Sequence, residues 1–378
     1  MRRNKWIVAL LIGVLLCSAL AAGCGKGPAA AKVGDVEIPV QSLENMYNSN
    51  SSYAAYYGAD LSTAEGIEAY QDQLLDQFID MEAKAYQANL AGVTLTSEEI
   101  ETAKTNAQST YDEFYQQFVD AAKNSGSSDV AAYANKLLTE TLAKNGKTLG
   151  GIKKEFLESA KKELLINKHQ EQLLSGVTPT EQEIQDMYNA ELTAQQTEFA
   201  SSPASFFTYQ TYYSYGYTCM PLTIPEGLFY VRQILVEDEA TANDLLAQIQ
   251  QGADFEALLA EYNTDPGMQT EENKQGYLVG TGASFVEPFL NAALALKKEG
   301  DVSGAVKSDY GYHIIKRMKD AVPGTIPYDT LKAKFEVYAT NKIKSDYYTK
   351  LADEWMQGDY ITRYPENYRH IGKSALEG

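Results

Sequence analysis

Short apolar runs rich in β-branched residues occur twice in the second half of the chain. The runs are Val231–Val236 and Ser308–Lys316, and both are typical of strands. Between them, apolar positions over Ala240–Tyr262 follow helical spacing with a break at Gly252. A second short helix is predicted over Glu287–Leu296, which is followed by two lysines and a glycine. The pattern predicts a β-helix-helix-β unit of under about 100 residues, which can bury a small core of its own.

The first half of the chain is predominantly helical in pattern. Residues 33–39 predict a strand pair before a helix that starts near Gln41. After this helix, each further predicted helix has its apolar residues on one face. Most of these apolar residues are expected to form the core. Capping boxes are predicted at Ser62 with Glu65, Thr96 with Glu99 and Thr180 with Glu183, and further helices over Asp129–Leu142 and Ile152–Leu174.

Two regions of the second half lie outside the β-helix-helix-β unit. Residues 201–226 are rich in tyrosine and proline without a sustained period, which is compatible with an ordered arm between domains or with a flexible connector. After Pro327, apolar residues at steps of four from Leu331 to Trp355 predict one long helix. No pattern after Gly358 predicts an element.

The amino terminus has the features of a secretory signal peptide. Cations at Arg2, Arg3 and Lys5 precede an apolar run and then small residues. The run is too short for a comfortable transmembrane helix. Leu20-Ala21-Ala22-Gly23-Cys24 resembles a bacterial lipobox, which predicts acylation of Cys24 and membrane anchoring through its acyl chains. The alternative is an ordinary cleavage site near Ala22 that leaves an unmodified cysteine.

Charge and composition narrow the function classes. The formal net charge is −19, and removal of the signal peptide would make it more negative by three, which argues against a nucleic-acid partner because phosphate contacts need clustered cations. Cys219 would have no intramolecular partner once Cys24 is acylated. The three histidines are far apart in sequence, so we expect no structural metal and no cofactor.

Five motifs in order give the β-helix-helix-β unit a family resemblance. They are Gln233-Ile234-Leu235-Val236, Phe255 to Asp265, Gly276-Tyr277-Leu278-Val279-Gly280, Phe289 to Ser303 and Gly311 to Ile315. In order and spacing this series resembles the parvulin family of peptidyl-prolyl isomerases over about 90 residues. The resemblance implies a small antiparallel sheet flanked by helices and rotation of X-Pro peptide bonds.

The resemblance also implies roles for individual residues. A pocket for the proline ring would be formed by Leu278, Phe285 and Phe289, although plain core packing is the alternative for each. The polar network would comprise Gln233, Asp265, Ser308 and His313. Asp265 precedes Pro-Gly and could be only a turn residue, and Ser308 could be only a strand-end cap.

Gln233 departs from the family pattern, which has histidine at this position. Glutamine can donate and accept and could therefore hold the tautomer of His313, but it cannot titrate. The loop after the strand predicted at Val231–Val236 begins with Glu237-Asp238-Glu239. Phosphate-specific parvulins carry cations at this place. We therefore expect no preference for phosphorylated Ser/Thr-Pro sequences.

The helical half adds a second resemblance. Val33-Gly34-Asp35 and Thr180–Ile184 resemble extracytoplasmic foldases of the PrsA/SurA type, in which the terminal helix packs on the helical domain. We expect an α+β protein in which N- and C-terminal segments form a helical chaperone domain and the parvulin domain is inserted between them. The expected parts are a signal peptide (1–23), a lipid tether (24–31), the helical domain (32–200), a linker (201–226), the parvulin domain (227–321), a C-terminal helix (322–358) and a tail (359–378).

The sequence favours a lipid-anchored foldase on the extracytoplasmic face of the cell membrane. Its partners would be unfolded or partly folded secreted proteins with X-Pro bonds, and the sequence leaves open a homodimer. The first alternative is a non-catalytic holdase with a degenerate parvulin domain, which Gln233 favours. A more remote alternative is a structural or adhesive surface lipoprotein, suggested by the tyrosine-rich segment.

Overall fold

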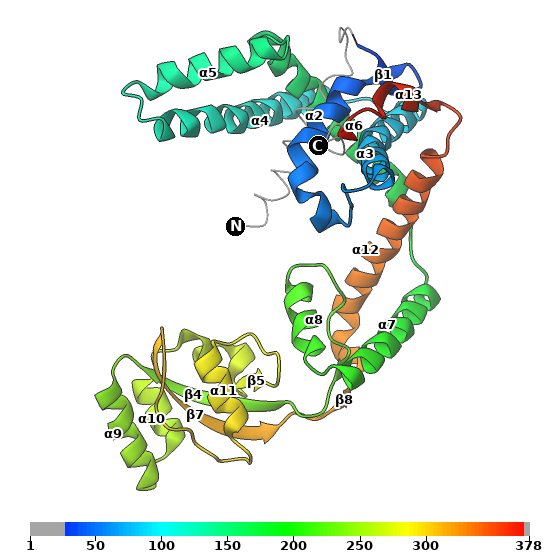
Figure 1. Ribbon diagram of the computed structural model, residues 1–378. Helices are drawn as coiled ribbons and strands as arrows, with labels where there is room; N and C mark the ends of the chain where they lie inside the picture. Colours follow the sequence, from blue (N-terminus) through cyan, green and yellow to red (C-terminus); the bar gives the residue numbers. More distant parts are fainter. Residues whose placement is uncertain (1–26, 374–378) are drawn as a thin grey trace. The chain divides into compact units, whose positions relative to one another are not determined.

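The computed structural model describes residues 27–373, which fall into two compact units (Figure 1). Unit 1 comprises residues 27–177 and 344–373, and unit 2 comprises residues 178–343. The predicted signal peptide and Cys24 lie outside the described residues. Helices dominate and the sheets are small and antiparallel, which confirms the predicted α+β class. Within residues 27–373, no helix has both the length and the apolar character that crossing a membrane requires.

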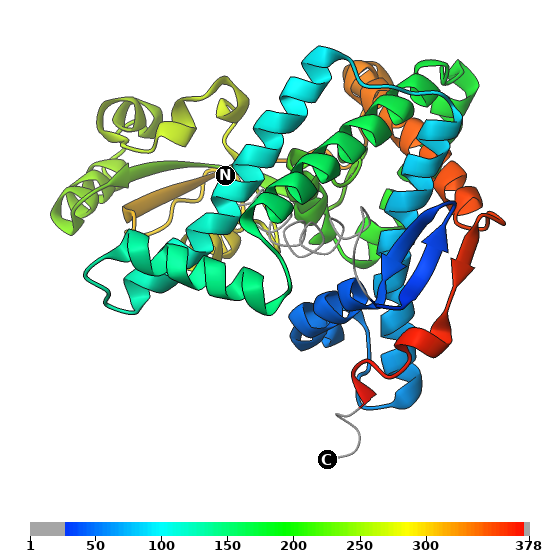
Figure 2. The same ribbon diagram turned by 90° about the horizontal axis from the view of Figure 1, so that it is seen from above.

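Unit 1 contains a three-stranded sheet in the order β2-β1-β9 (Figure 2). Strand β1 (Ala29–Val33) turns into β2 (Val36–Pro39) at Gly34, whose φ of +56° favours glycine. The other edge of β1 pairs with β9 (Ile361–Arg363). The strand pair is as predicted, but the end of the predicted tether is wrong, because buried Ala30 and Ala31 belong to β1.

Helices α2 (Val40–Asn50) and α3 (Ala64–Leu90) pack on this sheet, and the 3-10 helix η2 (Ser51–Tyr57) contacts α2. The predicted apolar face of α3 is buried at Ile67 and Phe78. The capping box predicted at Ser62 and Glu65 is wrong. Thr63 is the N-cap and its hydroxyl accepts the Gly66 N–H at 3.0 Å, while the Ser62 hydroxyl donates to Asp60.

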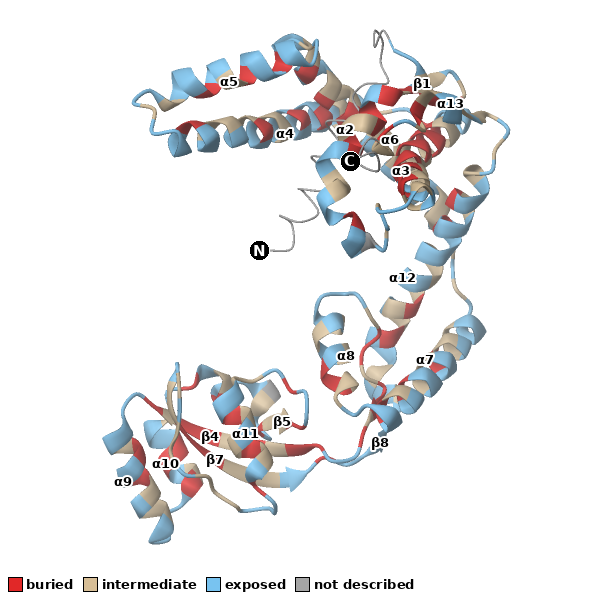
Figure 3. Cartoon of the chain, in the orientation of Figure 1, coloured by how far each residue is buried: buried red, intermediate tan, exposed pale blue. Residues whose placement is uncertain are grey.

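Three further helices of unit 1 share a separate apolar core. They are α4 (Ser97–Asn124), α5 (Val130–Lys144) and α6 (Leu149–Ser175). The capping box predicted at Thr96 and Glu99 is confirmed. Figure 3 shows the buried stripes of α4 and α5 facing each other, and Phe114 and Phe156 pack edge to face at 5.8 Å in the core between α4 and α6.

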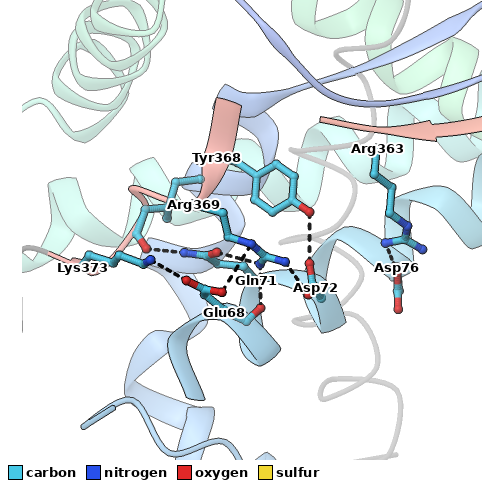
Figure 4. Close-up of polar contacts among 9 residues, drawn as sticks. Glu68, Gln71, Asp72, Asp76, Arg363, Tyr368, Arg369 and Lys373 are labelled. Carbon is cyan, nitrogen blue, oxygen red and sulfur yellow. Dashed lines mark hydrogen bonds and ion pairs between the residues drawn. The ribbon is translucent and has the colours of Figure 1, made fainter. Parts of the chain in front are cut away.

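The C-terminal segment, for which the sequence predicted no element, completes unit 1. After β9, the short helix α13 (Pro365–Tyr368) places the ring of Tyr368 in the core with no exposed surface. Arg369 donates to Asp72 at 2.7 Å and to Gln71 and the Glu68 carbonyl, each at 3.0 Å (Figure 4). These contacts attach the segment to α3. They satisfy the guanidinium in a fixed fork geometry.

Unit 2 contains a four-stranded antiparallel sheet in the order β5-β4-β7-β6. The strands are β4 (Phe229–Val236), β5 (Tyr277–Val279), β6 (Val306–Ser308) and β7 (Gly311–Asp320). Helices α9 (Glu239–Gln250) and α10 (Phe255–Tyr262) pack on one face, and α11 (Glu287–Ala295) packs on the other. Two 3-10 turns, η3 (Pro266–Gln269) and η4 (Glu271–Asn273), lie between α10 and β5. These elements agree with the predicted β-helix-helix-β unit.

The remainder of unit 2 differs from the predicted domain limits. Helix α7 (Glu181–Ser201) begins at the predicted Thr180 capping box, but it belongs to unit 2 and not to the helical domain. The predicted linker contains α8 (Ser205–Ser214) and the strand β3 (Thr223–Ile224), which pairs with β8 (Gly324–Thr325). Its buried apolar side chains make it an ordered arm instead of a flexible connector. Helix α12 (Tyr328–Trp355) contributes its first half to unit 2 and its second half to unit 1.

Replacement of Arg369 by alanine should destabilise unit 1 by about 1–3 kcal/mol, because it removes three partly buried hydrogen bonds that the charged guanidinium donates. Trp355 lies in unit 1, and the other tryptophan, Trp6, lies in the predicted signal peptide. Trp355 fluorescence during urea unfolding therefore reports on unit 1. The control is Lys104→Ala, which removes an exposed pair with Glu101 and should cost less than about 0.5 kcal/mol. Equal losses in the two variants would contradict the prediction.

Candidate active site

Strand alternation gathers polar side chains on the sheet face that α11 covers. In the antiparallel register Gln233 lies opposite Ile315, and Leu235 lies opposite His313. Gln233 and His313 are therefore diagonal neighbours on one face. Their exposed fractions are 5% and 3%, so each needs hydrogen-bond partners inside the protein.

These partners form a continuous chain. The Ser308 hydroxyl lies 2.6 Å from His313 Nε2, and His313 Nδ1 lies 2.6 Å from Gln233 Oε1. Gln233 Nε2 donates to Asp265 Oδ2 at 2.6 Å, and the Tyr277 hydroxyl donates to the same oxygen at 2.8 Å. The structure thus brings together all four predicted polar residues and adds Tyr277 to them.

The polarity of this chain determines the tautomer of His313. The amide nitrogen of Gln233 donates to Asp265 Oδ2, so the amide oxygen, which can only accept, faces His313. His313 Nδ1 must then carry the proton, which leaves Nε2 to accept from the Ser308 hydroxyl. The geometry thus agrees with the expectation that Gln233 could hold the tautomer of His313.

Asp265 and Ser308 also have the structural roles that were the alternatives. Asp265 caps η3 by accepting the Gly267 N–H at 2.8 Å, and it accepts from Gln233 with its other oxygen. Ser308 accepts the Tyr310 N–H at 3.1 Å at the β6–β7 turn and contacts His313. A turn or cap role and a network role are therefore compatible at both positions.

An aromatic wall stands beside the polar chain. The ring of Phe285 lies 5.0 Å from that of Phe289 and 5.3 Å from that of Tyr277, and Phe289 lies 5.5 Å from the His313 imidazole. Leu278 is not part of this wall. It pairs with Tyr230, and alternation directs its side chain to the other face of the sheet. Tyr277 stands where the resemblance put Leu278.

Sequence reasoning missed Tyr277 and Asn263. Asn263 accepts the Leu235 N–H at 2.9 Å and the Asp265 N–H at 3.2 Å, which links the turn to β4. Period-two counting along Tyr277–Val279 would have separated the side chains of Tyr277 and Leu278. No local signal identifies Asn263, because its partners depend on how the turn meets the sheet.

Burial controls the electrostatics of the site. It lowers the pKa of His313 below its ordinary value of 6.5, while the Asp265 carboxylate acts in the opposite direction. Burial, and next the hydrogen bond to Asp265, raise the pKa of Tyr277. The side chains of His313 and Tyr277 are therefore neutral near pH 7. The hydrogen-bond chain thus contains neutral donors beside the carboxylate of Asp265.

Unit 1 contains a separate cavity of about 480 Å³ between the β1–β2 hairpin, α3 and α6. The ion pair between Lys162 and the buried Glu82 lies in its wall. Its size suits a few residues of a peptide. Apolar lining residues include Val33, Val36, Ala85, Tyr86 and Leu165.

Comparison with known proteins agrees with the resemblance. Residues 234–319 match the family model of the PPIC-type PPIase domain, and residues 1–137 match that of the SurA-like N-terminal domain. The resemblance predicted from the motifs is thereby confirmed.

Individual relatives match over parts of the chain. Foldase protein PrsA of Caldanaerobacter subterraneus subsp. tengcongensis is 36% identical over 138 residues, which cover 36% of this chain and 43% of that protein. Foldase protein PrsA of Geobacillus kaustophilus is 47% identical over 83 residues, 22% of this chain and 28% of that protein. The chain thus matches less than half the length of these relatives.

Among solved structures, the parvulin NmPin of Nitrosopumilus maritimus is 33% identical and covers 25% of this chain and 99% of its own, with a TM-score of 0.22. PrsA from Bacillus subtilis is 19% identical, and the match covers 88% of this chain and 91% of that protein, with a TM-score of 0.23. At these TM-scores the structural similarities carry no argument.

The His313 ring should titrate below pH 6.5 when it is followed by NMR, because burial disfavours the imidazolium. Asp265→Asn should lower this pKa further, since the carboxylate favours the charged ring. Asp329→Asn, an exposed change at the start of α12, should leave it unmoved. A midpoint above 6.5 in the wild type would contradict the assignment.

The same shift makes the stability of unit 2 depend on pH. Unfolded His313 takes up a proton near pH 6.5, whereas folded His313 does so at a lower pH. This contribution to stability is therefore fully present above about pH 6.5 and is lost as the pH falls through the folded pKa. In urea unfolding at pH 7.5 and pH 5.0, His313→Gln should lose less stability on acidification than the wild type. An equal loss would argue that His313 is not the responsible group.

Proposed function

We propose that this chain, which carries a PPIC-type peptidyl-prolyl isomerase domain and a SurA-like N-terminal domain, is an extracytoplasmic folding factor. Unit 2 accelerates cis/trans isomerisation of X-Pro bonds in unfolded secreted proteins, and unit 1 holds these clients. The observation that carries the proposal is the unbroken hydrogen-bond chain from Ser308 to Asp265 beside Phe285 and Phe289. Its continuity through Gln233 is what an active site would require at this departure from the family pattern.

The chemistry needs no nucleophile, metal or cofactor. Resonance in the amide sets a rotation barrier of about 18–20 kcal/mol, and the X-Pro isomers differ by only about 0.5–1 kcal/mol. The catalyst must therefore bind the twisted amide better than either planar form. In this proposal Phe285, Phe289 and Tyr277 hold the proline ring in apolar surroundings. There the twisted bond, which has lost resonance, is favoured over the polar planar amide.

The polar residues fix the electrostatic environment of that pocket. With Nδ1–H held by Gln233, the imidazole of His313 keeps one orientation, and Ser308 is held in turn. Groups that are already oriented need no reorganisation as the amide twists. Gln233 is a positioning residue in this scheme, because it acts through His313.

The charge distribution supports clients without phosphate. Glu237 and Asp238 follow β4, and Glu239 is the first residue of α9, which Asp238 caps by accepting the Thr241 N–H at 2.9 Å. Three acidic residues there would repel a phosphate group. A peptide containing phosphoserine-proline should therefore turn over no faster than its unphosphorylated twin.

The second candidate is a holdase whose parvulin unit binds segments without catalysis. Gln233 favours it, because glutamine cannot titrate and does not reproduce a pair of histidine rings. Client binding by the unit 1 cavity would suffice for this function. The two candidates differ in whether X-Pro exchange is accelerated.

A proline isomerisation assay on the mature chain separates them. We expect acceleration in the wild type and a loss of about 100-fold in His313→Ala, the lower end of the range for removing one preorganised electrostatic group. The exposed His370, in unit 1, provides the control His370→Ala, which should leave the rate unchanged. No acceleration in the wild type with a gain in Gln233→His would favour the holdase.

Localisation is proposed from the sequence alone. Acylated Cys24 would anchor the protein to the extracytoplasmic face of the cell membrane, because two or more acyl chains make anchoring stable. Cys24→Ser should move the protein from the membrane fraction to the soluble fraction and abolish labelling by radioactive palmitate. Unchanged fractionation and no labelling of the wild type would support an ordinary secreted form.

A further inference from the structure

The segment from Phe199 to Pro225 contains no charged residue, although 22% of the whole chain is charged. We name this segment the aromatic arm. It contains α8, and the burial of α8 changes along its length, from a buried end to an exposed end (Figure 3). The arm is thus an uncharged segment, partly buried and partly exposed, in an acidic protein.

The buried end of α8 is fixed to the isomerase domain. Phe206 and Phe207 pack in one cluster with Leu228, Ala283 and Leu278. A Cβ added at Gly280 would lie 3.2 Å from the Phe207 ring, and one added at Gly282 would lie 2.7 Å from Ala204 Cβ. The arm thus packs directly against the turn that follows β5.

Phe285 connects this contact to the candidate active site. It packs against the arm cluster and against the cluster of Phe289 and Tyr277. The buried part of the arm is therefore in one apolar cluster with Phe285, a residue of the aromatic wall.

The exposed end of α8 and the turn after it present tyrosine rings. Tyr212, Tyr215 and Tyr217 are 47%, 51% and 61% exposed. Tyr217 lies 6.3 Å from each of the other two rings. Exposed tyrosines in an uncharged stretch of sequence resemble the central parts of binding surfaces, where charged residues are depleted and tyrosine is enriched.

We infer that the aromatic arm is a second client subsite, which binds the uncharged aromatic or apolar residues that flank an X-Pro bond held in the pocket. Tyrosine rings stack on such side chains and on proline rings without needing an opposite charge. This inference rests on the proposed function. It adds that selectivity for flanking residues is set by the arm, outside the β4–β7 sheet.

The test uses three blocked proline peptides and the full mature chain. One peptide is Ala-Leu-Pro-Ala, the second has flanks of tyrosine and phenylalanine, and the third has serine flanks of the same length. The arm variant is Tyr212→Ser/Tyr215→Ser/Tyr217→Ser, which changes exposed rings only. The control is Tyr133→Ser/Tyr347→Ser, which removes exposed tyrosines from unit 1. Both kcat/KM for isomerisation and Kd by fluorescence anisotropy are measured at low and high salt.

The wild type should prefer the aromatic peptide to the serine peptide by about 10-fold, from a few ring contacts, and the preference should be insensitive to salt. In the arm variant the ratio should fall to about one, while the control variant keeps it. An unchanged ratio in the arm variant overturns the inference. Loss of a dimer in the arm variant, with no change in peptide preference, also overturns it and assigns the arm to a second copy of the chain.

Two results separate this inference from the proposed function. If the wild type accelerates none of the three peptides, the isomerase proposal fails, and the Kd ratio still tests the arm. If Ala-Leu-Pro-Ala is turned over and the aromatic flanks give no advantage in rate or in Kd, the isomerase proposal stands and the arm inference fails.

Discussion

The antiparallel pairing of β4 with β7 is the constraint on which the candidate site depends. These strands are far apart in sequence, and their register alone makes Gln233 and His313 neighbours. A shift of one residue would turn every side chain of one strand to the opposite face. The register is fixed by two cores, since Ile234 and Ile314 are buried under α9 and α10 while Val231 and Ile315 are buried under α11. Packing on both faces therefore holds the polar chain in place.

Much of this arrangement could be predicted, because the local sequence signals between Phe229 and Asp320 agree with the elements that form there. β-branched runs, helical spacing and the Asp265-Pro266-Gly267 turn each indicated the element that the structure contains. The four polar residues could be named from motifs, but their hydrogen-bond order could not. That order depends on which amide atom of Gln233 faces Asp265, and this is decided by tertiary contacts. The side chain of Leu278 was misplaced for a simpler reason, because it was assigned to the pocket from the resemblance and the alternation along β5 was not counted.

Prediction failed most clearly where an element depends on a distant partner. Strand β9 and helix α13 have no periodic signal of their own, and they form because β1 offers a free edge and α3 offers Asp72 and Gln71. The same holds for α7, whose start was predicted from Thr180 although its assignment to unit 2 was not. Local signals thus located the ends of helices better than the limits of the units.

The position of β1 between β2 and β9 has a consequence for the order of folding. Unit 2 is one continuous stretch of chain, whereas the sheet of unit 1 joins Ala31 to Arg363. In a chain that emerges amino terminus first, unit 2 can fold while the edge of β1 that β9 will cover is still unpaired. Closing so long a loop also slows the last step. Unit 2 can therefore be complete before unit 1, because the sheet of unit 1 needs β9, which leaves the ribosome after all of unit 2.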